Sequence, residues 1–117
     1  MLIPVTDAQG GDRNQRGTHW SLLLLDRRDR NRPIAYHYDS LGDYHDAAAQ
    51  RVAGTVGAAR VIRMGMAQQK NGRDCGVFLL EAAQALIGQL IRGQPPRDLD
   101  NLVPDRRALQ ARLQRLT

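Results

Sequence analysis

Four consecutive leucines, Leu22–Leu25, constrain the fold of this chain more than any other feature of its sequence. Successive side chains of a strand point to opposite faces, so an unbroken apolar run within Trp20–Asp26 predicts a strand that is buried on both faces. A charged turn, Arg27–Arg32, separates it from a second run that is rich in β-formers, Ile34–Asp39. The short connection predicts that the two strands form an antiparallel hairpin.

Helical periodicity is clearest from Cys75 to about Ile91, where the polar positions fall on one stripe, which is typical of a largely buried helix. The other expected elements are a strand over Leu2–Val5, a polar loop over Asp7–Gly17, a helix capped by Asp43 or Asp46 and ending near Val56, a strand over Arg60–Met64, a polar loop over Gly65–Asp74 and an amphipathic helix over about Asp105–Leu116. Residues 1–117 are therefore predicted to form a single α/β (α+β) domain, in which a small antiparallel or mixed sheet packs on a buried helix.

Composition limits the class of protein. A chain of 117 residues is long enough for one domain. It has no apolar stretch of membrane-spanning length, and Met1–Asp7 lacks the basic-then-apolar layout of a secretory signal. Cys75 is the only cysteine, so no intramolecular disulfide can form, which favours a reducing compartment or a thiol kept for its chemistry. The net charge of +5 comes almost entirely from arginines that are scattered along the chain.

Two polar residues at the open end of the hairpin form a candidate catalytic pair. If the hairpin turns about Asp29, His19 lies opposite Asp39, and their side chains come within hydrogen-bonding distance. A register shift of one residue would separate them. A carboxylate that orients an imidazole is what a general base requires, so we predict that Asp39 orients His19.

Cys75 has the position of a nucleophile. With Asp74 as N-cap, the thiol lies in the first turn of a helix, where unpaired N–H groups and partial positive charge stabilise a thiolate. The backbone N–H of Cys75 can bind an oxyanion, and Gln69 can supply a second donor from the preceding loop. Gly72 and Gly76 allow the backbone to pass close to a substrate.

Each of these residues also has a commoner explanation. A histidine at a strand start is usually an edge residue, Asp39-Ser40 is typical of a turn, and Gln69 is usually solvated. A cysteine in an apolar helical run usually packs in the core. The joint order and spacing of the four residues favours an active site over these separate explanations.

Three segments resemble, in this order, the SUMO-protease (Ulp/SENP) family. They are Gly17-Thr18-His19-Trp20-Ser21-Leu22, then Tyr38-Asp39-Ser40-Leu41-Gly42, then Gln69-Lys70-Asn71-Gly72-Arg73-Asp74-Cys75-Gly76-Val77-Phe78. In that family a His-Trp pair, an Asp-Ser pair and a Gln-x-Asn-x-x-Asp-Cys-Gly segment follow one another, and the last segment is the most specific. The resemblance extends from about Ile3 to the end of the helix that begins at Cys75.

The resemblance implies a thiol-protease fold in which His19 is the general base, Asp39 its orienter, Gln69 an oxyanion donor and Cys75 the nucleophile. It implies that Trp20 helps to wall a narrow channel for the C-terminal Gly-Gly tail of SUMO or another ubiquitin-like protein, with Gly76 also at the substrate. The Cys75 thiolate would attack the carbonyl of the terminal glycine and form a thioester that water hydrolyses. Neither a cofactor nor a metal is implied.

The resemblance also concerns the extent and the location of the protein. The family's catalytic domain is considerably longer and has a further N-terminal portion that helps to bind the partner, so we expect a partial domain. The texture of the sequence is similar to bacterial type III effectors of this family. This implies a protein of the bacterial cytoplasm that is exported into the cytoplasm or nucleus of a host cell.

Two rival functions keep the same fold. Effector acetyltransferases use a related His–acid–Cys site and also form a thioester, although Gln69 and the context of Cys75 favour a protease. A module that holds ubiquitin-like proteins without cleaving them is the second rival, and measured turnover would separate it from an enzyme.

Rivals of other classes are weaker. A nucleic-acid binder is disfavoured because one Trp, one Phe and three Tyr are too few for a stacking platform. His19, His37, His45 and Cys75 have no familiar zinc spacing, so no metal site is predicted. Ser21 and Ser40 lack the Gly-x-Ser-x-Gly elbow of a serine hydrolase.

Overall fold

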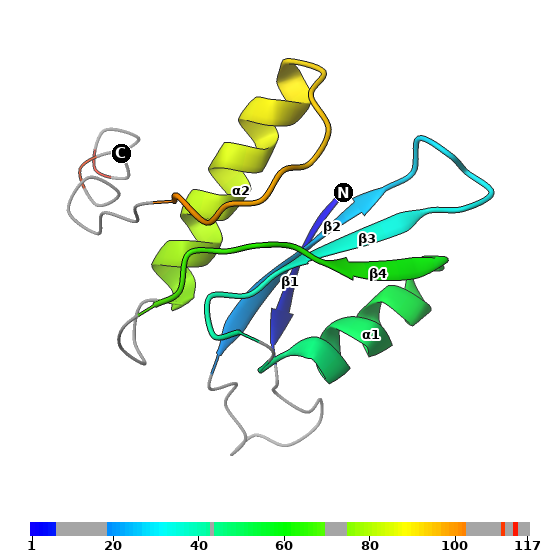
Figure 1. The fold of residues 1–117 in the computed structure, drawn as a ribbon, viewed down its shortest axis with the longest axis horizontal. Coiled ribbons are helices and arrows are strands. Elements are labelled where there is room, and N and C mark those ends of the chain that lie inside the picture. Colours follow the sequence, from blue (N-terminus) through cyan, green and yellow to red (C-terminus); the bar gives the residue numbers. More distant parts are fainter. Residues whose placement is uncertain (7–18, 43, 70–74, 103–110, 112–113, 115–117) are drawn as a thin grey trace.

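The computed structural model describes residues 1–6, 19–42, 44–69, 75–102, 111 and 114. In this part of the chain four strands form one sheet, in the order β1-β2-β3-β4 (Figure 1). β1 pairs with β2 and β2 with β3 in antiparallel fashion, whereas β3 and β4 are parallel, which confirms the predicted small mixed sheet. The elements are β1 (Leu2–Thr6), β2 (Trp20–Asp26), β3 (Ile34–Tyr38), α1 (Asp46–Thr55), β4 (Arg60–Arg63) and α2 (Cys75–Ile91).

The register of the β2–β3 hairpin differs from the prediction. Asp26 pairs with Ile34 and Leu22 with Tyr38, so the turn is centred one residue beyond Asp29 and facing positions shift by two. The turn itself explains the shift, because the Asp29 carbonyl accepts from the Arg32 N–H at 3.1 Å. A shift of two residues leaves every side chain on its original face, whereas a shift of one would have reversed the faces.

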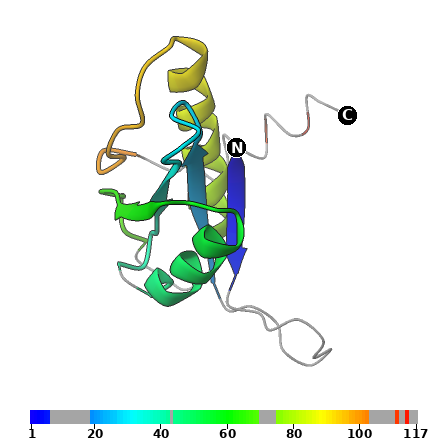
Figure 2. The same cartoon turned by 90° about the vertical axis from the view of Figure 1, so that its right-hand side faces the viewer.

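The two helices cover opposite faces of the sheet, as the alternation of the buried leucines shows (Figures 1 and 2). Leu22 and Leu24 pack with the α2 residues Phe78, Ala82 and Leu86. On the other face, Leu23 and Leu25 pack with buried alanines of α1. Burial of all four leucines confirms the prediction from the leucine run, and each contributes about 1.5–3 kcal/mol to the folded state.

The start of α1 differs from the prediction. His45, not an aspartate, occupies the N-cap position, and its side chain makes no capping hydrogen bond. Asp46 is the first residue of the helix, where its negative charge interacts favourably with the helix dipole. Asp43 lies outside the described residues. The helix ends at Thr55 before Gly57, whose φ of 81° suits glycine.

Other predicted boundaries agree closely with the structure. α2 begins at Cys75 and ends at Ile91 as expected, and Gly93 follows with a φ of 70°. Among the described helices, none is long and apolar enough to cross a membrane. The predicted loop Asp7–Gly17 and almost all of the predicted helix Asp105–Leu116 lie outside the described residues.

Candidate active site

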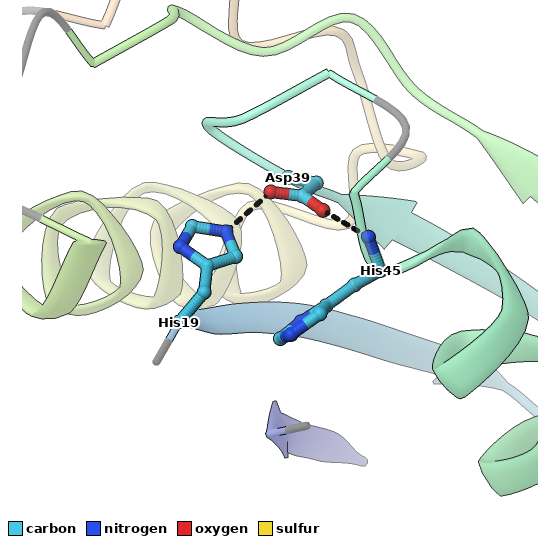
Figure 3. A group of neighbouring side chains, drawn as sticks. All are labelled: His19, Asp39 and His45. Carbon is cyan, nitrogen blue, oxygen red and sulfur yellow. Dashed lines mark hydrogen bonds and ion pairs between the residues drawn. The ribbon is translucent and has the colours of Figure 1, made fainter. Parts of the chain in front are cut away.

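His19 and Asp39 meet at one end of the central hairpin. His19 directly precedes β2 and Asp39 directly follows β3, and both are buried. Nε2 of His19 lies 2.5 Å from Oδ1 of Asp39 (Figure 3). The predicted contact is therefore present despite the changed register. The ladder ends at the Leu22–Tyr38 pair, and beyond it the two chains approach on the same face, as diagonal neighbours do.

The Asp39 carboxylate is held by backbone donors. Oδ1 also accepts from the Leu41 N–H at 2.9 Å, and Oδ2 accepts from the His45 N–H at 3.0 Å. These bonds explain why β3 ends at Tyr38 instead of Asp39, since the chain turns around the carboxylate. They also fix the plane of the carboxylate, and thereby the direction from which it meets His19.

The second nitrogen of the His19 ring is the one available for chemistry. Nδ1 is buried and has no hydrogen-bond partner among the residues that the structure describes. Figure 3 shows it on the side of the ring turned away from Asp39. Because the carboxylate engages Nε2, the neutral ring carries its proton there and keeps the lone pair on Nδ1, which can accept a proton from a thiol.

Gln69 lies beside the same end of the sheet. Its backbone N–H donates to the Ser40 carbonyl at 2.9 Å, and its Oε1 accepts from the Ser40 hydroxyl at 2.5 Å. The amide oxygen is thereby engaged, which makes Nε2 the end of the side chain that can donate to an oxyanion. Gln68 anchors the neighbouring backbone, since its Nε2 donates to the Asp39 carbonyl at 3.0 Å.

Cys75 begins α2 and is partly exposed. It lies six positions after Gln69, so the two Cα atoms are at most about 20 Å apart. Both views of the fold show α2 beginning toward the end of the molecule where β2 begins (Figures 1 and 2). Asp74, its predicted N-cap, lies outside the described residues, as does Gly72.

The two residues predicted at the substrate differ in their surroundings. Trp20 follows His19 directly and is 43% exposed, so part of its indole is open to solvent. At Gly76 an added Cβ would meet, beyond its own helix backbone, no atom of the described residues within 4 Å. Both positions can contact a substrate from outside.

Three potential metal ligands also gather here. His19, Asp39 and His45 offer ligand atoms within 4.8 Å of one another, a proximity that their spacing in the sequence did not indicate. Both oxygens of Asp39 already accept hydrogen bonds from N–H donors. The geometry is therefore that of a hydrogen-bonded pair with its supports, and the absence of a resident metal remains a prediction.

Comparison with known proteins identifies the family. Residues 13–103 match the Ulp1 protease family, C-terminal catalytic domain. The chain belongs to this family. It is a family of cysteine peptidases, and the predicted thiol-protease fold is thus confirmed.

Relatives of the Ulp1 family support the assignment. The chain is 34% identical over 96 residues to Sentrin-specific protease 8 of Rattus norvegicus, covering 75% of this chain and 43% of the relative. It is 29% identical over 124 residues to NEDD8-specific protease 1 of Schizosaccharomyces pombe, covering 98% of this chain and 29% of the relative. The chain thus spans less than half the length of these curated relatives.

A solved structure matches as well. The Xanthomonas campestris effector protein XopD, bound to ubiquitin, superposes with a TM-score of 0.80 at 30% identity. The match covers 97% of this chain and 59% of that structure. The fold described above is therefore that of a Ulp1-family protease over this part of the domain.

Sequence reasoning missed several polar residues around the Ulp1-family site. Ser21 of β2, His37 of β3 and His45 before α1 are all buried close to His19 and Asp39. The two-residue period of strands was the available signal. Ser21 lies two positions after His19, and His37 two positions before Asp39, so each pair shares a face of the sheet. His45 had no comparable signal.

Proposed function

We propose that this chain is a cysteine protease that cleaves after the C-terminal Gly-Gly of SUMO or a related ubiquitin-like modifier. The observation that carries the proposal is the state of His19. One ring nitrogen is fixed by Asp39 at 2.5 Å, and the other is buried and without a partner among the described residues. A histidine held in this way can act as a general base, because its second ring nitrogen can accept a proton.

The proposed reaction gives His19, Cys75 and Gln69 the roles that the family resemblance implies. His19 Nδ1 takes the proton of the Cys75 thiol, and the sulfur attacks the carbonyl carbon of the terminal glycine. The backbone N–H of Cys75 and Nε2 of Gln69 stabilise the oxyanion. The protonated His19 then gives its proton to the departing amine, leaving a thioester on Cys75. His19 next removes a proton from water, which cleaves the thioester and frees the glycine carboxylate.

Trp20 and Gly76 are proposed to admit the substrate. Trp20 is exposed next to His19 and can wall a channel in which only glycine, without a side chain, passes the catalytic pair. Gly76 has no side chain of its own, and among the described residues nothing beyond its own helix fills the space that a Cβ would take. Both features favour a tail of two glycines over bulkier residues.

The modifier is proposed as a class. The names of the relatives refer to sentrin and to NEDD8, and XopD is seen bound to ubiquitin. SUMO, NEDD8 and ubiquitin are therefore the modifiers to compare. XopD is described as an effector, which supports the proposal that this chain is exported from bacteria into the cytoplasm or nucleus of a host cell.

A cleavage assay tests the proposal. The chain is incubated with SUMO, NEDD8 or ubiquitin, each extended by a short peptide after Gly-Gly. The masses of the products are measured by mass spectrometry. We expect cleavage after the second glycine of at least one modifier, none with Cys75→Ala, and a raised KM with Trp20→Ala. Cleavage that persists in Cys75→Ala would contradict the proposed nucleophile.

A second candidate is a module that binds ubiquitin-like proteins without cleaving them. It is favoured by the exposed indole of Trp20, which can contact a partner protein whether or not cleavage follows. Binding of an unmodified ubiquitin-like protein, measured by calorimetry, together with no cleavage of any extended modifier, would favour this candidate over the protease.

A further inference from the structure

His45 breaks a local rule at the start of α1. Ser, Thr, Asp and Asn are preferred at the N-cap because their side chains satisfy the first N–H groups of the helix. His45 occupies this position, makes no side-chain cap and is only 1% exposed. Local preferences of this kind are broken mostly at functional sites. The inward side chain of His45 therefore indicates a role other than capping the helix.

His45 contacts both members of the catalytic pair. Its backbone N–H donates to Asp39 Oδ2 at 3.0 Å, and its ring lies 4.8 Å from the His19 ring between centroids (Figure 3). Tyr44 contacts the same His19 ring edge-on at 5.4 Å. The His19 ring is therefore restrained through its nitrogen by Asp39 and through its surface by two neighbouring rings.

A buried chain of hydrogen bonds fixes the His45 ring in turn. The Ser21 hydroxyl lies 3.0 Å from His45 Nδ1 and 2.8 Å from His37 Nε2. One hydroxyl donates a single hydrogen, so Ser21 donates to one histidine and accepts from the other. All three side chains are at most 2% exposed, and water cannot substitute for a lost partner.

Asp46 determines which groups donate and which accept in this series of hydrogen bonds. His37 Nδ1 lies 3.6 Å from Asp46 Oδ1, which favours the His37 proton on that nitrogen. Nε2 of His37 then accepts from Ser21, and Ser21 accepts from the Nδ1–H of His45. Burial lowers the pKa of His37, which keeps the ring neutral and the direction of the chain constant at neutral pH.

We propose that His45, held by Ser21 and His37, is a positioning residue that sets the orientation of His19 and Asp39 for catalysis. The inference rests on the proposed function, since it assumes that His19 forms an ion pair with the Cys75 thiolate. His45 acts through its neighbours and does not touch the substrate. If its ring or its support is removed, His19 rotates away from the direction in which it stabilises the thiolate.

Alkylation of Cys75 by iodoacetamide tests this inference without any modifier. The reagent is neutral and reacts with the thiolate, so the rate against pH reports the thiolate population. For the unaltered chain we expect faster alkylation at pH 6 than for His19→Ala, because the imidazolium stabilises the thiolate. His19→Ala provides the reference profile without the imidazolium.

Two variants remove the ring or its support. His45→Asn keeps the backbone N–H to Asp39 and adds a good N-cap, so the fold is retained while the ring is lost. Ser21→Ala removes the bridge between the histidines. We expect each to lower the alkylation rate at pH 6 by about 10-fold and to move the profile toward that of His19→Ala. His37→Gln, which can still accept from Ser21, should retain most of the rate.

The outcomes separate the inference from the proposed function. Leu86 is a core residue of α2. Leu86→Val should destabilise the protein without altering the hydrogen bonds among His37, Ser21 and His45, and it serves as the control. Unchanged profiles in His45→Asn and Ser21→Ala, or an equal shift in Leu86→Val, would overturn the positioning role and leave the protease proposal intact. An unaltered chain whose profile equals that of His19→Ala would overturn both.

Discussion

The two faces of the central sheet differ in how they are built. The face beneath α2 is apolar, with Leu22, Leu24 and Tyr38 packed against Phe78, Ala82 and Leu86. The face beneath α1 begins apolar, at Leu23 and Leu25, and becomes polar toward its end, at Ser21, His37 and His45. Burying polar side chains costs free energy unless each finds a partner. The α2 face therefore supplies stability, and the polar end of the α1 face supplies orientation to His19.

Replacing the Asp39 carboxylate should have the largest effect on activity. Asp39→Asn places an NH₂ group opposite either the His19 or the His45 N–H donors, which the carboxylate now satisfies together. We expect the cleavage rate to fall about 10²- to 10⁴-fold, because His19 loses its orientation and tautomer. Steady-state kinetics measures the loss. A rate within about threefold of the unaltered chain would remove Asp39 from the mechanism.

Truncating the apolar face should instead cost stability. Leu86 is fully buried, so Leu86→Ala should lower the free energy of unfolding by about 2–5 kcal/mol in urea titrations. Leu80→Ala, on the same helix but 46% exposed, is the matched control and should lower it by much less. Equal losses in the two variants would mean that α2 does not pack as described.

Acid should weaken the polar end of the α1 face. Burial lowers the pKa of His37 below its usual 6.5, with nearby His45 acting in the same direction and Asp39 and Asp46 opposing it. Below pH 6.5 the unfolded chain therefore binds a proton that the folded chain excludes until the pH falls to the lowered value. Stability should fall with pH in this window, by at most about 1.4 kcal/mol per pH unit from this group.

Comparison with His37→Gln isolates this contribution, because glutamine does not titrate. The difference in unfolding free energy between the two proteins, measured by urea titration between pH 7.5 and 5, should change in favour of the variant as the pH falls. A difference that is constant across this range would show that folding does not lower the pKa of His37.

Substituting two glycines of α2 should have the smallest effects on stability, and only one of the two substitutions should change activity. Alanine is the better helix former, so Gly76→Ala and Gly88→Ala should each stabilise the chain by about 0.5–1 kcal/mol or leave it unchanged. Of the two, only Gly76 adjoins Cys75, where a Cβ would meet nothing beyond its own helix backbone within 4 Å among the described residues and where we propose that the substrate passes. We expect its turnover to fall by up to about 10²-fold, with Gly88→Ala unaffected. Equal activities would exclude a substrate contact at Gly76.

The sequence predicted the elements with strong periodicity and failed where side chains decide the local geometry. The leucine run and the 17-residue helix α2 were predictable because their apolar patterns are unambiguous. The hairpin register was not, because the hydrogen bonds of Asp29 within the turn select the centre. The α1 cap failed for a similar reason, since His45 serves the buried network instead of the helix end.

The candidate site was predictable in part. His19 and Asp39 could be paired from the hairpin because a two-residue error preserves the face of each side chain. The role of Gln69 as an oxyanion donor, inferred from its spacing to Cys75, stays a prediction, and its contact with Ser40 depends on a loop crossing that no local pattern encodes. The chain from His37 through Ser21 to His45 joins β3, β2 and the start of α1, and only the tertiary structure brings these together.

The most direct test of the protease claim is the intact mass of the chain after incubation with SUMO, NEDD8 and ubiquitin that carry a thiol-reactive group in place of the C-terminal carboxylate. We predict a mass increase equal to one modifier with at least one of the three, and its loss in Cys75→Ala. If no modifier forms an adduct while iodoacetamide still alkylates Cys75, the thiol is reactive but the chain does not recognise a Gly-Gly tail, and the protease claim is wrong.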